Sequence, residues 1–420
     1  MPFLSVRGPG LETTAPGPAA PTRSFWIVAF AFAALMAFGT LPTPLWPLFA
    51  ARDDFGSTMV TVAFAAMVVG AAASFLLLGH LSDRLGRRRI IVPALLTSAT
   101  AALLLVVWHG TAGLLIARVV TGLGTGLMAS TATAYLSDLY VRSHPERAGS
   151  PVPGLVAAVA NLGGLALGPL AAGALAQWAP APLTTPFVLF GVVLVVLSVL
   201  VLTGPETVDR QAAGAVPARF GLRPGGGTAF AAAAGIGFFS FAVMGFFSSL
   251  GAVMVRGVLG ISSPFIAGLA PFAVFAASAG AQLALARLSA PRMLMTGTVL
   301  FPVGLALTAL ALFHPALALF LTAAAITGAG AGLLFKASVG QSVAAALPSS
   351  RAGVLAVFFA IAYAGMGLPS IGFSLVSHQL GLRPSMIGFA AALSLGALTS
   401  VIASRRLEAP AGGRHRATTA

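Results

Sequence analysis

The chain has 420 residues, of which 58% are hydrophobic and only 8% are charged, and its formal net charge is +14. A mean hydropathy of +0.98 excludes a soluble globular domain, in which about a quarter of the residues are charged. The absence of cysteine excludes disulfides, thiolate metal sites and cysteine nucleophiles. The composition predicts an all-α integral membrane protein.

The N-terminal segment is rich in proline, glycine and threonine and shows no helical apolar period. Residues 1–23 are therefore predicted to form a disordered cytoplasmic tail. The apolar stretch that follows Arg23 is longer than the apolar region of a signal peptide and has the length of a membrane span.

Twelve apolar runs are long enough to cross a bilayer, which takes about 20 residues per helix. They begin near Ser24, Ser57, Ile90, Ala112, Pro151, Thr184, Thr228, Pro264, Met293, Pro315, Ala352 and Ser385. Most arginines fall in the segments that twelve spans would leave on one side, and positive residues are retained in the cytoplasm. The sequence predicts a multi-pass protein of the plasma (inner) membrane with both termini cytoplasmic. Nucleic-acid binding is the minor explanation of the net charge.

The loop between the second and third runs, Gly79–Arg89, reads GHLSDRLGRRR and holds four arginines and one aspartate. It resembles the loop between helices 2 and 3 of the major facilitator superfamily, written G-x-L-x-D-R-x-G-R-[RK]. The matching residues are Gly79, Leu81, Asp83, Arg84, Gly86, Arg87 and Arg88. The resemblance implies a secondary transporter in which Asp83 joins arginines and a helix end to latch two halves on the cytoplasmic face. From the residues alone, the arginines could serve only to set topology.

The fourth run contains a glycine pattern, RVVTGLGTG, at Arg118–Gly126. This segment is similar to the R-x-x-x-G-x-G-x-G motif of proton-linked members of the same superfamily. Gly122 and Gly126 are spaced to allow another helix to approach closely. A dinucleotide-binding loop is disfavoured because no strand pattern precedes the glycines.

Arg118 is a candidate functional residue, because a guanidinium inside the membrane costs about 2.5 to 3.5 kcal/mol on insertion scales. Helical spacing puts Thr121, Thr125 and Tyr135 on the same face. These four residues are predicted to line a cavity. The alternative is that Arg118 snorkels near the outer end of its helix.

The fifth run contains NLGGLALGPLAAG, which is similar to the antiporter motif G-x-x-x-G-P-x-x-G-G. The matching residues are Gly164, Gly168, Pro169 and Gly173. Proline removes a helical hydrogen bond and permits a hinge, and in this family the motif tends to mark exporters. Ala172 stands where the family often has glycine, and a packed Gly/Pro helix is the alternative.

An internal repeat divides the chain. TGLGTGL at Thr121–Leu127 recurs as TGAGAGL at Thr327–Leu333, an offset of 206 residues. The repeat predicts two pseudo-symmetric six-helix halves. The predicted boundaries are a first half at 24–203, a cytoplasmic linker at 204–228, a second half at 229–403 and a basic cytoplasmic tail at 404–420.

The residue types that are rare in this chain narrow the possible energy sources for transport and the possible catalytic or metal sites. Lys336, the only lysine, is not part of a P-loop, so a secondary mechanism is expected. The 9 acidic residues map to loops, tails or helix ends, which leaves proton coupling open. No histidines are spaced for a metal. The chain is expected to be a non-enzymatic monomer without cofactor or metal, in contact with the lipid bilayer.

The substrate class follows from charge. A cavity with Arg118 and Lys336 but no carboxylate favours neutral or anionic solutes. The phenylalanines of the seventh run suit apolar or aromatic solutes. The alternative is that these phenylalanines serve packing or lipid contact. The sequence predicts a secondary active transporter that exports such a small molecule by alternating access, with exchange for protons as an open possibility. The alternatives are a facilitator or importer of one metabolite and a transporter-like sensor.

Overall fold

The computed structural model describes residues 19–78, 81–208 and 220–408, which are almost wholly helical. The described residues contain 12 helical segments that are long and apolar enough to cross a membrane. The predicted all-α class with twelve spans is confirmed. The span starts agree closely with the prediction, and one of the largest differences is at the eleventh, which begins at Pro348 instead of Ala352.

The twelve spans follow one another along the chain. The first six are built from α1 (Ala19–Thr40) with η1 (Thr43–Leu45) and α2 (Trp46–Asp53), α3 (Ser57–Ala73) with the π-helical η2 (Ser74–Leu78), α5 (Arg88–Val107), α6 (Thr111–Ser143), α7 (Val152–Trp178) and α8 (Thr185–Leu202). The last six are built from α9 (Gly226–Gly257), α10 (Pro264–Ala284), α11 (Ala290–Leu310), α12 (Leu317–Ala345), α13 (Arg351–Leu380) preceded by η4 (Pro348–Ser350), and α14 (Leu382–Glu408).

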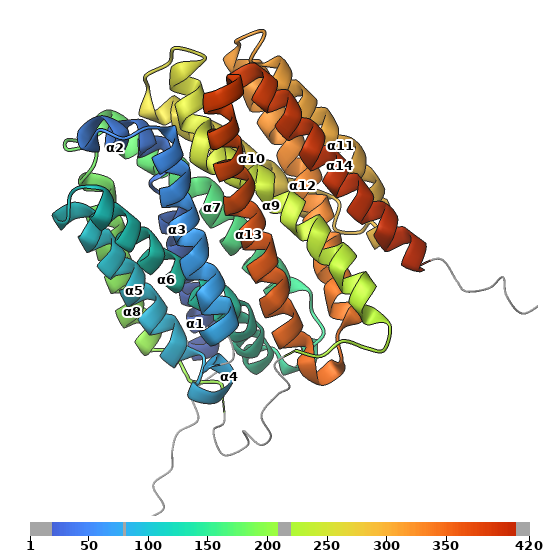
Figure 1. Cartoon of the computed structure of the whole chain (residues 1–420). Coiled ribbons are helices and arrows are strands. Elements are labelled where there is room, and N and C mark those ends of the chain that lie inside the picture. The colour runs from blue at the N-terminus through green and yellow to red at the C-terminus, as the bar shows by residue number, and fades with distance from the viewer. Residues whose placement is uncertain (1–18, 79–80, 209–219, 409–420) are drawn as a thin grey trace, which may run out of the picture.

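The bundle has two distinct ends, seen at the bottom and top of Figure 1. One carries the short helix α4 (Leu81–Leu85) and is called the α4 end, and the other carries α2 and is called the α2 end. The first span does not cross as one straight helix, because prolines follow α1 and the chain turns through η1 into α2. The first span therefore brings Trp46 into the bundle, where it is completely buried.

The internal repeat corresponds to equivalent helix contacts in the two halves. A Cβ built on Gly122 of α6 would overlap the carbonyl oxygen of Met67 in α3. A Cβ built on Gly328 of α12 would overlap the carbonyl oxygen of Val274 in α10. Only glycine permits backbones to approach this closely, so the repeated glycines fix the fourth span on the second and the tenth on the eighth.

The halves meet along two helix pairs, α3 with α13 and α7 with α10. Figure 1 shows α3 and α13 side by side. At the α2 end, polar side chains bridge the halves in the pairs Ser57 with His378, Thr58 with Ser374, and Ser263 with Gln177. Nearer the α4 end, Phe75 of η2 stacks on Phe359 of α13, with ring centroids 5.5 Å apart. The interface is thus neutral where its side-chain contacts are described.

The phenylalanines of the seventh span serve mainly packing. Phe246 and Phe247 of α9 are fully buried, and Phe246 packs against Phe373 and Phe389. Phe241 lies elsewhere, in a ring cluster with residues of the tenth and eleventh spans. The packing alternative therefore accounts for most of this aromatic surface.

Candidate functional site

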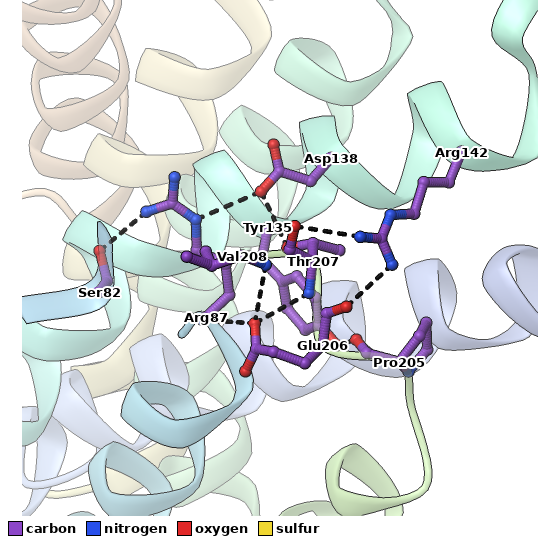
Figure 2. Close-up of polar contacts among 9 residues, drawn as sticks. All are labelled: Ser82, Arg87, Tyr135, Asp138, Arg142, Pro205, Glu206, Thr207 and Val208. Atoms are coloured by element: carbon purple, nitrogen blue, oxygen red, sulfur yellow. Dashed lines mark hydrogen bonds and ion pairs between the residues drawn. The ribbon is translucent and has the colours of Figure 1, made fainter. Parts of the chain in front are cut away.

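Arg87 is the centre of a polar network at the α4 end (Figure 2). Its guanidinium donates from Nε to Oδ2 of Asp138 at 3.3 Å and from Nη1 to Oγ of Ser82 at 2.9 Å. Its backbone N–H donates to Oε1 of Glu206 at 2.8 Å. The loop between the second and third spans is thus tied both to the end of α6 and to the residues that follow α8.

The Glu206 carboxylate also binds backbone N–H groups of the residues that follow it. Its Oε1 also accepts the backbone N–H groups of Thr207 and Val208, at 2.9 and 3.3 Å. The carboxylate lies where a Cβ of Gly86 would be, and Gly86 has a φ of +108°, a conformation that favours glycine. Glycine is therefore needed at position 86 for two reasons, backbone conformation and space for Glu206.

Two arginines and a tyrosine hold the chain as it leaves α8. Arg142 of α6 donates to the carbonyl oxygens of Glu206 and Thr207, at 2.9 and 3.1 Å. Arg88 donates to the carbonyls of Leu202 and Gly204, at 3.0 and 2.9 Å. Figure 2 shows the Tyr135 hydroxyl directed at Pro205, and it donates a hydrogen bond to the carbonyl oxygen of that residue. The start of the predicted linker is thus bound to the first half.

The predicted loop residues differ in how much the structure says of them. Gly79 lies outside the described residues, and Asp83 lies within α4. Arg84 is exposed, whereas Gly86, Arg87 and Arg88 take part in the network described above. Sequence reasoning missed Glu206. The available signal was an acidic residue directly after an apolar span in a chain whose loops are arginine-rich.

Arg118 is buried inside the first half, 1% exposed. Its Nη1 donates to the carbonyl oxygen of Gly39 at 3.1 Å, and its Nη2 contacts Sδ of Met67 at 2.9 Å. Its guanidinium carbon lies 5.7 Å from the ring centroid of Trp46. No described carboxylate touches it, and its Nε has no hydrogen-bond partner among the described residues. The cation is surrounded by a carbonyl, a thioether and an indole.

The other predicted cavity residues do not gather around Arg118. Thr121 and Thr125 are buried and donate to carbonyl oxygens of their own helix. Tyr135 lies in the network at the α4 end, about 25 Å further along the helix at 1.5 Å per residue. Lys336 is half-buried and donates to the carbonyl of Gln282 in α10 at 2.8 Å.

The glycines of the fifth span divide between two neighbours. A Cβ on Gly164 or Gly168 would overlap carbonyl oxygens of α1. A Cβ on Gly173 would lie 2.6 Å from the carbonyl oxygen of Pro264 at the start of α10. Pro169 offers its own carbonyl oxygen to Gly268, where a Cβ would lie 2.5 Å away. This motif therefore forms close backbone contacts with α1 of its own half and with α10 of the other half.

The described acidic residues lie at the two ends of the bundle. Asp53 pairs with its neighbour Arg52 at the α2 end, with 2.7 Å between Nη2 and Oδ2. Asp138 lies at the α4 end with Arg87. Within the described ranges, no group of three or more histidine, aspartate or glutamate side chains could hold a metal ion.

Replacing Glu206 by alanine is expected to destabilise the α4 end by about 2 kcal/mol, because hydrogen bonds to a charged group contribute about 1.5 to 3 kcal/mol each and this site is partly exposed. Thermal unfolding of the purified protein would measure the loss. Glu206→Gln keeps an acceptor oxygen and is expected to lose less. The exposed Glu146 offers a control, since Glu146→Ala removes a carboxylate without a described contact; an equal loss there would contradict the assignment.

Comparison with known proteins supports the fold. The bacterial homologue of the human lysosomal transporter Spinster, solved inward-facing and unoccupied, has a TM-score of 0.68 at 15% identity, over 93% of this chain and 98% of that one. The human organic anion transporter MFSD10 has a TM-score of 0.64 at 16% identity, over 92% and 100%. The nucleoside transporter NupG has a TM-score of 0.68 at 12% identity, over 91% and 99%.

A curated relative shares only a short segment. The arabinose-proton symporter of Bacillus subtilis is 31% identical over 80 residues, which cover 19% of this chain and 17% of the symporter. The chain thus matches less than a fifth of the length of that relative. The family model described as Major Facilitator Superfamily matches residues 27–367. With twelve spans, two repeated halves and this match over most of its length, the chain belongs to the major facilitator superfamily and is a multi-pass membrane transporter.

Proposed function

We propose that this transporter works by alternating access and exports a small neutral or anionic compound of apolar or aromatic character. The α4 end, with its arginines, faces the cytoplasm of a cell whose plasma membrane holds the protein as a monomer. The observation that carries the proposal is Arg118, a buried cation without a described carboxylate beside it. A cationic solute would be repelled there, whereas neutral and anionic solutes are accepted.

The contacts between the halves support a moving interface. The described side-chain bridges at the α2 end join hydroxyl, imidazole and amide groups, such as Thr58 with Ser374 at 3.2 Å. A neutral hydrogen bond contributes about 1 kcal/mol net, so these bonds can break in each cycle without stranding a charge. The described ion pair of Arg87 with Asp138 lies within one half, and so stays intact when the halves move.

Export is supported by the fifth span, where Pro169 and Gly173 form backbone contacts with α10 across the interface. Their motif resembles that of exporters, and a Gly/Pro segment at this contact suits a pivot. Protons are the coupling ion to test first, because the relative that matches a short segment of this chain is named as a proton symporter. Asp53, Asp54 and Asp138 are the carboxylates that a proton could use near the membrane ends.

The test is retention of neutral, anionic and cationic antibiotics and dyes in efflux-deficient bacteria that express the chain, with and without a protonophore. Reduced retention of neutral or anionic compounds, restored by the protonophore, is expected. Asp83→Asn is expected to abolish this export with normal membrane insertion, because the loop resemblance assigns the latch to that carboxylate.

The outcomes separate the alternatives. Flux that ignores the protonophore would favour a facilitator, and increased accumulation would favour an importer of a specific metabolite. Wild-type export rates in Asp83→Asn would remove the latch assignment and leave topology as the role of the loop arginines.

A further inference from the structure

We propose that Arg118, which lies beside Gly39 and Trp46, binds the negatively charged group of an anionic substrate, a carboxylate or a group of similar charge and shape. The inference rests on the proposed transport function and deepens it. It narrows the substrate from neutral or anionic compounds to anions, and it names the atoms that recognise the charge.

The guanidinium of Arg118 has unused donor capacity. Arginine has five N–H donors. In the described structure Nη1 donates to Gly39 and Nη2 contacts Met67, while Nε has no partner. A thioether sulfur is a weak acceptor. The planar fork of an arginine matches a carboxylate with two parallel hydrogen bonds, so the side chain is better satisfied with an anion than with its present neighbours.

The charge of Arg118 has no anionic counterpart. Arg118 is 1% exposed, and a buried cation without an anionic partner is costly. Two of the described carboxylates near the membrane ends are engaged with other arginines, Asp53 with Arg52 and Asp138 with Arg87, and no described carboxylate contacts Arg118. The charge of Arg118 is therefore balanced only by neutral groups, and an arriving anion would remove the imbalance.

The surroundings of Arg118 favour a charged ligand over a neutral polar one. The hydroxyls of Thr121 and Thr125 donate to carbonyl oxygens of their own helix. The indole N–H of Trp46 donates to the carbonyl oxygen of Ser248 at 3.1 Å. These three donors are occupied, so among these residues and Arg118 it is the guanidinium that retains donors for a ligand. A site with a cation as its free donor prefers an anion to a neutral hydrogen-bonding solute.

The site also touches the interface between the halves. Trp46 belongs to the first half and Ser248 to the second, and the guanidinium of Arg118 lies 5.7 Å from the indole centroid. Cation–π attraction is stronger in a desolvated setting than at an exposed surface. An anion that pairs with the guanidinium weakens this attraction, so binding of the substrate charge acts on Trp46, the residue whose indole N–H bonds the second half.

The competing explanation is that Arg118 only fastens helices, since Gly39 belongs to α1 and Met67 to α3. Fastening and anion binding differ in one measurable respect. An arginine with only a structural role has no saturable affinity for anions, whereas a binding site does. Trp46 can report the difference, because a bound anion would lie beside its ring.

The experiment uses the purified full chain with Trp26→Phe, Trp108→Phe and Trp178→Phe, which leaves Trp46 as the only tryptophan. The three replaced residues are 53%, 46% and 71% exposed, whereas Trp46 is 0% exposed. Trp46 fluorescence is titrated with iodide at constant ionic strength and pH 7. Saturable quenching is expected, and benzoate should displace the iodide while the matched neutral benzamide should not.

Variants assign the effect to Arg118. Arg118→Gln is expected to abolish the saturable quenching. Arg118→Lys keeps the charge without the fork and should bind benzoate about tenfold more weakly, as measured by displacement of iodide, which provides a measurement if Arg118→Gln does not fold. Arg256→Gln is the matched control, because Arg256 is exposed near the same end and lines a surface pocket with Pro44 and Pro47. It should leave the quenching unchanged.

Three results would overturn the inference: quenching that does not saturate, saturable quenching that survives in Arg118→Gln, or iodide that benzoate does not displace, which would mean an inorganic anion only. Binding is measured without flux, so the inference and the proposed function fail separately. If the chain exports neutral compounds but Trp46 fluorescence shows no anion binding, the anion site is refuted and the transport proposal stands. If anions bind but no flux is seen in proteoliposomes, the transport proposal is refuted.

Discussion

A disulfide between cysteines introduced at Thr58 and Ser374 is expected to stop turnover completely. The two hydroxyl oxygens lie 3.2 Å apart, and the residues belong to α3 and α13 in different halves. A disulfide holds two Cα atoms within about 7 Å. Alternating access requires the halves to separate at the α2 end whenever the site opens there. Substrate flux in proteoliposomes, measured after oxidation and again after reduction, should fall to background and then recover.

The chain offers a clean background for this cross-link, since it contains 0 cysteines. A matched control pair lies within the first half, where a Cβ on Gly191 of α8 would be 3.4 Å from Cβ of Ala102 in α5. A disulfide between cysteines at Ala102 and Gly191 should leave turnover unchanged. Full flux through the oxidised Thr58/Ser374 variant would contradict opening at the α2 end.

Adding a single methyl group at Gly122 or Gly328 is expected to cause one of the largest losses of stability in the chain. A Cβ at Gly122 would lie 2.7 Å from the backbone nitrogen of Ala71, besides overlapping the carbonyl of Met67. Backbone atoms cannot move aside like a side-chain end, so α3 and α6 must separate. Overpacking of this kind costs about 1 to 3 kcal/mol. The midpoint of thermal unfolding and the monodisperse yield after extraction would measure the effect of Gly122→Ala and Gly328→Ala.

Gly340→Ala is the control for the tenth span, because a Cβ at Gly340 would meet nothing within 4 Å. Because alanine has a higher helix propensity than glycine, Gly340→Ala should leave the stability of the protein unchanged or raise it slightly. Equal behaviour of Gly328→Ala and Gly340→Ala would show that the close approach of α12 to α10 does not limit stability.

The twelve spans could be predicted because membrane insertion depends on local composition. An apolar run of about 20 residues satisfies its own backbone as a helix, whatever its neighbours are. The close helix contacts of Gly122 and Gly328 could also be predicted, since their repeated spacing is a local sequence pattern. These features need no knowledge of how the helices are arranged around one another.

The polar network at the α4 end was only partly predictable, because it joins residues that are distant in the chain. The loop motif pointed to Arg87 and Arg88, but Glu206, which accepts from Arg87, and Gly204, which accepts from Arg88, follow α8, more than a hundred residues later. Tyr135 was grouped with Arg118 by helical spacing. Spacing assigns a face and says nothing about depth, and Tyr135 lies at the other end of the same helix.

The surroundings of Arg118 could not have been predicted for a similar reason. Its position in an apolar run marked it as unusual. Its neighbours are the carbonyl of Gly39, the sulfur of Met67 and the ring of Trp46, none of which is a charged residue that composition would single out. Carbonyls at a helix end and aromatic faces become visible as cation partners only when the helices are assembled.

The anchoring of the chain between the halves bears on how such a protein could be divided or assembled. The segment after α8 is bound to the first half through Glu206, and Leu222 forms a backbone bridge with Ala346 of the second half. Each anchor therefore stays with its own half if the polypeptide is interrupted between positions 208 and 222. Two genes, each encoding six spans, could supply the same transporter, with α3 pairing with α13 and α7 with α10 after independent insertion.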